Sequence, residues 1–574
     1  MSEAVAGGFG QLLHTAATAC GGVEVEFVVG SALRAIVSPR RDSAVAAVDA
    51  TFEVAGRTMR LRVGLPRTFP RAPPDVYLLR PRPTQLLAHC EKKTGWVCFA
   101  AREGMAISNR RLDAVVKEAI SLAISTLAAA SEGSSSDEVL RELGSYWQQS
   151  ADYAARSFVA ADGRVRTVEY TLTAGRVDII ADDVNEARDY FPVAAGGTVR
   201  TAVYVPLAGS VKDDHIDPNE FTSPARLRAL LADHVADDSR RELARALKRR
   251  SPRLFLLGFP RGDGRRTLVA LRCFPRDGAD PLHSARSNEL IAVERYDIGY
   301  VRERGGALQE LEHAHVLVLG CGSVGGHLAV ALAHAGVRHL TLADPDVMSV
   351  DNTFRHVLGR TCHGENKAAA LANEVRRRVP GVRVEAFELP ASDVLDGKHV
   401  DVRAVSAVVV AIGDPSESRY LNEALLAADL PVVFAWLEPL GLGGHALATR
   451  PRTSGCYECL YSEPDGGERL GARSDFSASG QQFTRDVSGC DSVFTPYGDL
   501  DARRSAELAA RSCVELLARA DSPSTLMSWK GDPTAFTAAG FTTSARWNMS
   551  QDQLVESRNA FSSPGCPVCG KTAG

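Results

Sequence analysis

Short apolar runs alternate with turn residues in the first part of the chain, the pattern of an antiparallel sheet. The runs VEVEFVV, TFEVAG and TMRLRVGL lie between residues 23 and 65, and a two-residue period marks a strand with one buried face. The proline-rich stretch PRTFPRAPPDVYLL follows, where only extended or turn geometry is open to the backbone. From Leu112 the apolar spacing becomes helical, in LDAVVKEAISLAISTLAAA and then VLRELGSYWQQS. We therefore predict a small α+β domain over residues 1–150.

The middle of the chain mixes strand-like runs with one charged amphipathic helix. The strand-like runs are RTVEYTL, RVDIIA, TAVYVPL, RLFLLGF and TLVALRCF, and the helix is DSRRELARALKRR. No convergent group of His, Cys and carboxylate side chains indicates an active site here. We predict an α/β linker or docking domain over residues 151–290.

Strands alternate with helices in the last part of the chain. The strands are HVLVLG, HLTLAD, VRVEAFEL, AVSAVVVAIG and PVVFAW, with helices from Val324 and over NKAAALANEVRRRV. This alternation predicts a mostly parallel, doubly wound, Rossmann-like sheet over residues 291–574. A chain of 574 residues is too long for one core, so a multidomain protein of α/β and α+β class is expected.

Composition and charge are those of a soluble globular protein. The chain is 45% hydrophobic and 24% charged, with a net charge of −4, which excludes a disordered chain and gives no sign of a nucleic-acid partner. The start MSEAVAGGFG does not have the pattern of a signal peptide, and the run AISLAISTLAAA is too short for a membrane span. We expect a cytoplasmic protein without a membrane partner, whose cysteines are thiols or metal ligands rather than disulfides.

Two CxxC pairs predict a metal site. They are Cys456-Tyr-Glu-Cys459 and Cys566-Pro-Val-Cys569. Each pair lets two thiolates bind one ion from a tight turn, and four sulfurs satisfy tetrahedral Zn²⁺ with no open position. We predict a structural zinc that ties the C-terminal tail to the last domain. Two independent redox motifs are the other interpretation.

A glycine-rich turn predicts a nucleotide site. The hexapeptide Gly320-Cys321-Gly322-Ser323-Val324-Gly325 follows an apolar strand and opens a helix. Its glycines Gly320, Gly322 and Gly325 let phosphate oxygens approach backbone N–H groups and the positive end of the helix dipole. Asp344 ends the next strand, where a carboxylate accepts hydrogen bonds from ribose hydroxyls. A dehydrogenase would share all of these features.

Four further polar residues favour nucleotidyl transfer over hydride transfer. Asn352, Arg355 and Lys367 bring an amide and two cations toward the same crevice, and Asp414 stands at the carboxyl end of AVSAVVVAIG. An enzyme that cleaves ATP between its α and β phosphates needs cations on the triphosphate and a carboxylate for magnesium. We therefore predict ATP and Mg²⁺ as cofactors, although each charge taken alone has the simpler interpretation of a solvated surface group.

The order of these motifs resembles a known family. GCGSVGG, LADPDVMSVDNTFRHVLG, GENKAAAL and AIGDPSESR are similar to the ThiF-type adenylation domain that ubiquitin-activating enzymes share with bacterial relatives in thiamine and molybdopterin synthesis. The resemblance implies that Asp344 binds ribose, that Asn352, Arg355 and Lys367 bind phosphates, and that Asp414 binds Mg²⁺. Relatives also carry the paired cysteines.

One position departs from that family. Relatives often have an arginine, acting in the partner subunit, in an RYxRQ-like segment, whereas RYDIGY has Ile298 at that place. Arg302 and Arg304 follow shortly afterwards, and no residue is assigned to this role.

Cys490 is the first candidate nucleophile. It lies in DVSGCDSVFTPYG, after the polar loop EPDGGERLGARSDFSASGQQ. A mobile loop can deliver a thiol to an acyl adenylate without crowding ATP, and related activating enzymes place their acceptor cysteine in this stretch. We predict that Cys490 forms a thioester; a buried packing cysteine is the other interpretation.

Cys98, in HCEKKTGWVCFAA, is the second candidate. PRTFPRAPPDVYLL, His89 and GWVC resemble ubiquitin-conjugating enzymes, in which a YPFxPP-like segment and an HPN motif precede the reactive cysteine. On this resemblance Cys98 is the nucleophile and Cys90 is incidental, whereas a lone cysteine is more often buried. The HPN asparagine has no equivalent, because Cys90 and Glu91 follow His89. Acceptance of the thioester is therefore better supported than the final transfer.

Together these resemblances imply an activating and conjugating enzyme. ATP activates the C-terminal carboxylate of a protein, Cys490 captures it as a thioester, and Cys98 passes it to a target amine, usually a lysine. The order of the domains resembles the fused ancillary protein of bacterial CBASS anti-phage systems, which implies a homodimer and a cGAS-like nucleotidyltransferase as the modified partner. Two alternatives remain open: activation of a ubiquitin-like or sulfur-carrier protein without conjugation, and a non-catalytic nucleotide-binding adaptor.

Overall fold

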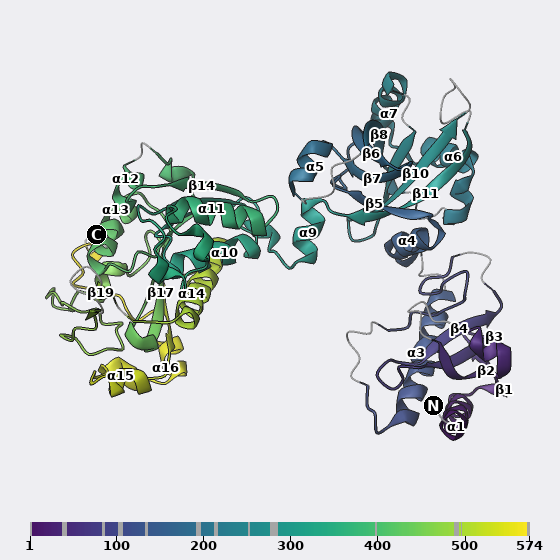
Figure 1. The fold of residues 1–574 in the computed structure, drawn as a ribbon, viewed down its shortest axis with the longest axis horizontal. Coiled ribbons are helices and arrows are strands. Elements are labelled where there is room, and N and C mark those ends of the chain that lie inside the picture. Colours follow the sequence, from purple (N-terminus) through teal and green to yellow (C-terminus); the bar gives the residue numbers. More distant parts are fainter. Residues whose placement is uncertain are drawn as a thin grey trace. The chain divides into compact units, whose positions relative to one another are not determined.

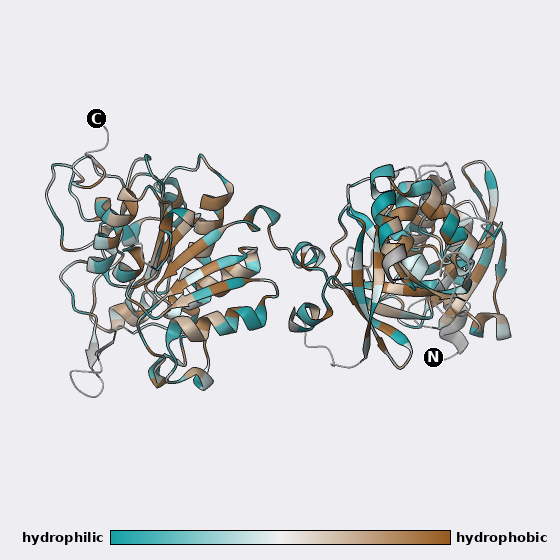
Figure 2. Cartoon of the chain, turned by 90° about the horizontal axis from the view of Figure 1, so that it is seen from above, coloured by the Kyte–Doolittle hydropathy of each residue, from teal (hydrophilic) through white to brown (hydrophobic). Residues whose placement is uncertain are grey.

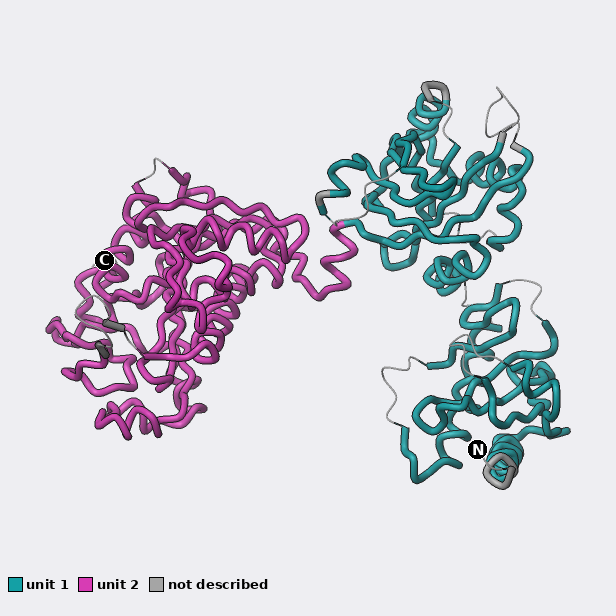
Figure 3. Tube along the Cα trace, viewed as in Figure 1, with its two compact units in different colours: residues 1–297 teal, residues 298–574 magenta. Residues whose placement is uncertain are grey.

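The chain divides into two compact units, residues 1–297 and 298–574, which Figure 3 colours differently. The computed structural model describes all residues except 1–2, 37–42, 83–85, 101–106, 132–135, 191–196, 210, 212–215, 251–252, 276–284, 397–398, 487–492, 495 and 571–574.

The first unit begins with a four-stranded antiparallel sheet in the order β1-β2-β3-β4 (Figure 1). Its strands are β1 (Val23–Phe27), β2 (Ala44–Val54), β3 (Arg57–Pro66) and β4 (Asp75–Arg80), and its helices are α1 (Glu3–Ala19), α2 (Gly30–Arg34) and α3 (Leu112–Ser131). Alternate residues of β2 and β3, such as Val48 and Leu61, form one core with Leu13 of α1 and Ile120 of α3. The α+β arrangement predicted for this region is confirmed.

Helix α3 is, among the described residues, the one helix long and apolar enough to cross a membrane by length and composition. Its residues Val116, Ile120, Ala123 and Leu127, spaced three or four apart, are fully buried in the core of the four-stranded sheet. A helix buried along such a stripe passes the same test, so packing accounts for its apolar sequence.

A closed seven-stranded barrel follows in the order β10-β11-β5-β7-β6-β8-β9. The strands are β5 (Tyr153–Ser157), β6 (Arg166–Thr173), β7 (Arg176–Ala181), β8 (Thr198–Pro206), β9 (Leu254–Pro260), β10 (Arg266–Pro275) and β11 (Ala285–Arg295). The helices are α4 (Ser136–Ser150), α5 (Val184–Tyr190), α6 (Pro224–His234) and α7 (Asp237–Arg250). Alternate residues of β9 fall into two cores: Leu254 and Leu256 join the barrel interior, whereas Phe255 and Leu257 pack beneath the covering helices.

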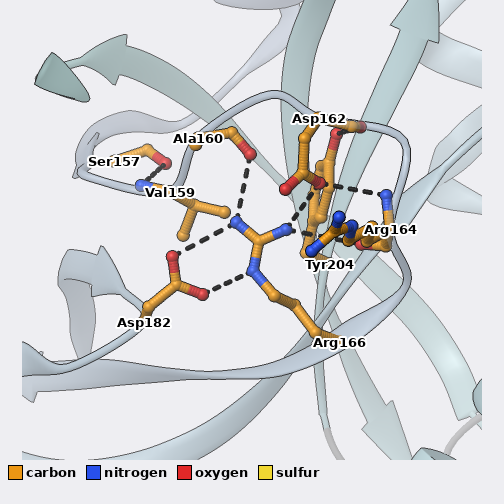
Figure 4. Close-up of polar contacts among 8 residues, drawn as sticks. All are labelled: Ser157, Val159, Ala160, Asp162, Arg164, Arg166, Asp182 and Tyr204. Carbon is orange, nitrogen blue, oxygen red and sulfur yellow. Dashed lines mark hydrogen bonds and ion pairs between the residues drawn. The ribbon is translucent and has the colours of Figure 1, made fainter. Parts of the chain in front are cut away.

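A cluster around Arg166 fastens the segment between β5 and β6 to the barrel wall (Figure 4). The Arg166 guanidinium binds both oxygens of Asp182 at 2.5 and 3.2 Å and one oxygen of Asp162 at 2.7 Å. It also lies 4.9 Å from the centre of the Tyr204 ring, whose hydroxyl donates to the Asp162 carbonyl. These contacts all lie within the barrel, so we interpret the cluster as a structural brace.

Helix α4 packs against the barrel. Leu140, Leu143 and Trp147 are buried in the core beneath the covering helices, and Trp147 Nε1 donates to the Ala270 carbonyl at 3.2 Å. The predicted domain limit at residue 150 coincides with the end of this helix. The division into three domains stays a prediction.

The second unit contains a seven-stranded sheet in the order β14-β13-β12-β15-β16-β17-β20. The strands are β12 (His315–Leu319), β13 (His339–Ala343), β14 (Arg383–Phe387), β15 (Ala407–Val410), β16 (Val432–Leu437), β17 (Gly443–Thr449) and β20 (Thr525–Lys530). The five strands from β14 to β16 are parallel, and β17 and β20 continue the sheet in antiparallel fashion.

Helices cover both faces of this sheet. The helices of this unit are α9 (Ile298–Arg304), α10 (Ser323–Ala335), α11 (Lys367–Arg378), α12 (Ala391–Leu395), α13 (Pro415–Ala427), α14 (Asp499–Ala518), α15 (Thr534–Ala538) and α16 (Gln551–Glu556). On β12, Val316 and Val318 pack under α10, α11 and α14, while Leu317 and Leu319 pack under α12 and α13. Figure 2 shows the resulting hydrophobic strands. The predicted doubly wound, mostly parallel sheet is confirmed.

Candidate functional site

The glycine turn joins β12 to α10 through two positions that admit no side chain. Gly320 has φ +92°, and a Cβ there would lie 2.7 Å from the Ala411 carbonyl oxygen. A Cβ on Gly325 would lie 1.9 Å from the Gly320 carbonyl oxygen. At Gly322 a Cβ would meet nothing within 4 Å. The turn is therefore packed tightly against neighbouring backbone at Gly320 and Gly325, whereas the space beside Gly322 is open.

A cavity of about 450 Å³ lies beside this turn. It is lined by Gly320, Gly322, Asp344, Asn352, Arg355 and Lys367, among others. The structure thus brings these six predicted nucleotide-binding residues together, whereas Gly325 lies behind the turn.

Asp344 is 6% exposed and fixes the turn from the end of β13. One carboxylate oxygen accepts the Cys321 N–H at 2.6 Å, and the other accepts the Asp346 N–H at 2.8 Å. Burial raises the pKa of this carboxyl above its usual value. Each oxygen has a second lone pair, so Asp344 can also accept hydrogen bonds from a ribose.

The two predicted phosphate-binding cations are held on the cavity wall. Lys367, at the start of α11, lies 2.8 Å from Asp346 Oδ2. The Arg355 guanidinium lies 4.8 Å from the centre of the Tyr497 ring. Cations on such fixed supports can stabilise charge on a triphosphate with little reorganisation.

A second cavity, of about 460 Å³, adjoins the first. Both are lined by Gly322, Ser323, Arg355 and Tyr497, and the second reaches Asp414, Trp436, Tyr457 and Asp475. Asp414 caps α13, since its Oδ1 accepts the N–H groups of Ser416 and Glu417 at 2.8 and 3.1 Å. Its carboxylate stands at the second cavity, where a role in binding Mg²⁺ remains a prediction.

His356 was not singled out from the sequence. It is 7% exposed, its Nε2 donates to the Cys321 carbonyl at 2.7 Å, and its Nδ1 accepts the Leu358 N–H at 3.1 Å. Burial lowers its pKa to about 4, so the ring is neutral at neutral pH. The ring therefore supports the glycine turn through the Cys321 carbonyl. In the sequence, the only indication of such a role was the position of His356 directly after Arg355 in FRHVLG.

The four predicted zinc ligands form one cluster. The sulfurs of Cys456, Cys459, Cys566 and Cys569 lie within 4.8 Å of one another. Cys456 and Cys566 are separated by 3.8 Å, and Cys459 and Cys569 by 3.3 Å. A tetrahedron with zinc–sulfur bonds of about 2.3 Å has sulfurs roughly 3.8 Å apart. The cluster therefore fits a four-coordinate zinc ion.

The segments around the cluster are fastened to their surroundings. Arg419 of α13 forms two hydrogen bonds with Glu458, at 2.8 and 2.7 Å. Arg473 donates to the carbonyls of Cys459 and Phe561, each at 2.6 Å. The cluster thus joins the C-terminal segment to the sheet, which suits a structural rather than a catalytic ion.

Of the two candidate nucleophiles, Cys98 is among the residues that the structure describes and Cys490 is not. Cys98 is exposed, whereas Cys90 is 1% exposed, and burial raises the pKa of the Cys90 thiol to about 12. Cys490 lies outside the described residues, between β18 (Arg485–Asp486) and β19 (Val493–Phe494), which pair with each other. A few residues later Tyr497 lines both cavities.

Two family descriptions match separate parts of the chain. Residues 296–493 match the ThiF family, and residues 29–155 match prokaryotic E2 family B. The chain therefore joins a segment that matches the prokaryotic E2 description to a segment that matches the ThiF description. The predicted recognition of a conjugating part fused to an adenylation part is confirmed, and ThiF-type folding agrees with the observed sheet.

Similar proteins support the same assignment. The ATP-dependent ubiquitin transferase-like protein Cap2 of Pseudomonas aeruginosa is 27% identical over 232 residues, covering 39% of this chain and 40% of that protein. The uncharacterized protein y4qC of Sinorhizobium fredii is 26% identical over 467 residues, covering 71% and 73%. The adenylyltransferase and sulfurtransferase MOCS3 of Sus scrofa is 32% identical over 182 residues, covering 31% and 38%.

The alignments span less than half the length of Cap2 and of MOCS3, so the activities of those whole proteins reach this fusion only as proposals. Among solved structures, that of E. coli MccB with MccA-N7isoASN is 21% identical, with a TM-score of 0.33, and the match covers 46% of this chain and 68% of that one. These comparisons support a ThiF-type segment over residues 296–493.

Proposed function

We propose that this fusion activates the C-terminus of a protein with ATP, holds it successively as thioesters on Cys490 and Cys98, and conjugates it to target amines. The observation that carries the proposal is the pair of adjoining cavities in the ThiF-type segment. On this proposal ATP occupies the cavity that contains the glycine turn, Arg355 and Lys367. The second cavity, with Trp436 and Tyr457, offers apolar walls to an extended C-terminal tail.

In the first step, an oxygen of the substrate carboxylate attacks the α-phosphorus of ATP, and pyrophosphate leaves. Arg355 and Lys367 stabilise the charge that develops on the phosphates, and Asp344 holds the ribose. Asp414 would hold Mg²⁺, which, when bound, neutralises phosphate charge. The product is an acyl adenylate.

In the second step, the Cys490 sulfur attacks the acyl carbon, its proton is released, and the bond to AMP breaks. This assignment rests on the place of Cys490 in the sequence and on the ThiF resemblance. The Cys98 sulfur then attacks the same carbon, and the bond to Cys490 breaks. The exposure of Cys98 beside a buried Cys90 supports this choice.

The partners are proposed from the resemblance to CBASS ancillary proteins and from relatives with the name ubiquitin transferase-like. They are a cGAS-like nucleotidyltransferase or a ubiquitin-like protein as the activated substrate, and lysines on target proteins as acceptors, in the cytoplasm. A homodimer is proposed from the same resemblance. Val347, Val350 and Phe354, in the segment that carries Asn352 and Arg355, are 54%, 64% and 92% exposed. Exposed apolar side chains favour burial against another chain.

The test combines two measurements on the full chain. Exchange of labelled pyrophosphate into ATP, dependent on a protein with an intact C-terminus, tests adenylation. Non-reducing electrophoresis of wild type, Cys98→Ala and Cys490→Ala tests the thioesters. We expect an adduct on Cys490 to persist in Cys98→Ala, and both adducts to disappear in Cys490→Ala. Adducts that survive in a chain carrying both Cys98→Ala and Cys490→Ala, or that resist thiols, would contradict the relay.

The similarity to MOCS3 favours one alternative, activation of a sulfur-carrier protein without conjugation. On that alternative, pyrophosphate exchange persists, and replacing Cys98 changes no product. A nucleotide-binding adaptor would show no pyrophosphate exchange at all.

A further inference from the structure

Cys98 lies beside His89 in a short hairpin. Cys90 and Val97 form an antiparallel bridge, and the Cys98 N–H donates to the His89 carbonyl at 2.8 Å. Cys90 and Val97 point inward, since they are 1% and 0% exposed, whereas the His89 side chain is 36% exposed and Cys98 is exposed. The backbone hydrogen bond between His89 and Cys98 therefore places these two residues next to each other, outside the buried pair Cys90 and Val97.

One carboxylate holds His89 at two points. His89 Nδ1 lies 2.6 Å from Glu142 Oε1, and the His89 backbone N–H donates to Glu142 Oε2 at 2.9 Å. The backbone N–H also lies 3.1 Å from the Tyr146 hydroxyl, which supports His89 in a left-handed conformation with φ +60°. A carboxylate at Nδ1 favours the tautomer with the proton on that nitrogen, which leaves the lone pair on Nε2.

Glu142, which holds His89, belongs to the barrel part of the first unit. Glu142 lies on α4, between Leu140 and Leu143, which are buried in the core beneath the barrel's covering helices. A second contact joins the same hairpin to that part: Lys92 Nζ lies 2.6 Å from Asp217 Oδ2. Asp217 in turn caps the short helix Pro218–Thr222. The barrel and its covering helices therefore fix the position of His89.

We propose that His89 is the proton acceptor for the amine that attacks the Cys98 thioester, and that Glu142 is its positioning residue. The inference rests on the proposed function and deepens it. As the carbon–nitrogen bond forms and the carbon–sulfur bond breaks, the amine proton moves to His89 Nε2. It then passes to the Cys98 thiolate, which restores both groups. The middle region thus takes part in transfer by holding this histidine.

The experiment loads Cys98 without ATP, so that it is independent of the adenylation step. The full chain carrying Cys490→Ala receives a fluorescent acyl group from a peptide α-thioester of mercaptoethanesulfonate, and a Cys98→Ala chain measures loading elsewhere. Excess thioester is removed, lysine is added, and loss of the adduct is followed in time. His89→Gly, Glu142→Gln and the matched control Glu138→Gln, one turn earlier on α4, are compared. Glycine suits the backbone at φ +60°.

We expect all variants to load. His89→Gly should discharge to lysine on the order of 100-fold more slowly, the usual range for loss of a general base. Added imidazole should restore much of its rate and leave the wild type unchanged. Glu142→Gln should slow discharge roughly 10-fold, as is common for a carboxylate that orients an imidazole. Glu138→Gln should match the wild type.

Two results would overturn the inference. One is discharge of His89→Gly at the wild-type rate. The other is slow discharge that imidazole does not accelerate, which indicates a purely structural role. If His89→Gly fails to load, the same comparison is made with Glu142→Gln, for which wild-type discharge excludes the positioning role. Absence of any ATP-dependent adduct in the wild type would instead contradict the proposed function, and chemical loading distinguishes that failure from failure of the histidine.

Discussion

Mild acidification should destabilise the second unit, because His356 binds a proton in the unfolded chain before it can do so in the folded one. This ring lies under the glycine turn, where Nε2 donates to the Cys321 carbonyl and Nδ1 accepts the Leu358 N–H. A proton on Nδ1 would break the second bond and place a charge in a site that is 7% exposed. Burial therefore lowers the pKa from 6.5 to about 4.

The magnitude follows from that difference. Between pH 6.5 and about 4 the unfolded chain binds a proton that the folded chain does not, so the free energy of unfolding falls as the pH decreases. The contribution of His356 is almost fully present at about pH 7, and about 2 kcal/mol of it is lost by about pH 5. For a unit of this size such a loss lowers the melting temperature by about 3 to 4 °C.

Scanning calorimetry of the full chain at the two pH values measures this effect, with the transition of the second unit recognised by its stabilisation with ATP. Because other groups also titrate, wild type is compared with His356→Gln, whose amide can still donate to the Cys321 carbonyl. The variant should lose about 3 °C less than the wild type on acidification. His334→Gln, an exposed position on α10, is the matched control. Equal acid shifts in wild type and His356→Gln would refute the reasoning.

Three further outcomes are expected. Gly325→Ala, whose Cβ would lie 1.9 Å from a backbone oxygen of the turn, should weaken ATP binding by about tenfold or more in calorimetric titration, while Gly359→Ala, where a Cβ meets open space, should not. One zinc per chain should be found by metal analysis, and chelation or Cys566→Ser should lower the melting temperature of the second unit on the order of 5 °C or more; full stability without metal would contradict a structural ion. Arg355→Ala should slow pyrophosphate exchange on the order of 100-fold, and an equal effect of the exposed Arg360→Ala would remove the case for a specific phosphate contact.

Much of the fold was accessible from the sequence because its signals are local. The runs HVLVLG and HLTLAD became β12 and β13, and NKAAALANEVRRRV became α11, since period and strand–helix alternation determine such elements. The closure of the middle strands into a barrel was not predicted. It depends on pairings between distant segments, such as β5 with β11, and no local pattern encodes them.

The candidate site divides along the same line. The glycine turn, Asp344 and the CxxC pairs stand in fixed spacings along the chain, so their proximity follows from motif and topology. His356 and Glu142 could not be found in this way, because their roles depend on contacts that only folding creates. His356 contacts the Cys321 carbonyl of the glycine turn, and Glu142 contacts His89. A histidine or glutamate in a helical or loop sequence has no mark that distinguishes such a role from solvation.

Helix α4 connects the barrel of the middle region to the hairpin that carries Cys98. One side of the helix buries Leu143 and Trp147 beside the barrel, and the other presents Glu142 and Tyr146 to the hairpin of Cys98. A shift of α4 along its axis by even one residue, about 1.5 Å, would withdraw the carboxylate from a contact of 2.6 Å. Packing of α4 in the barrel core therefore controls the position of His89. Substitutions of core residues that contact α4 should impair amine transfer more strongly than loading of Cys98.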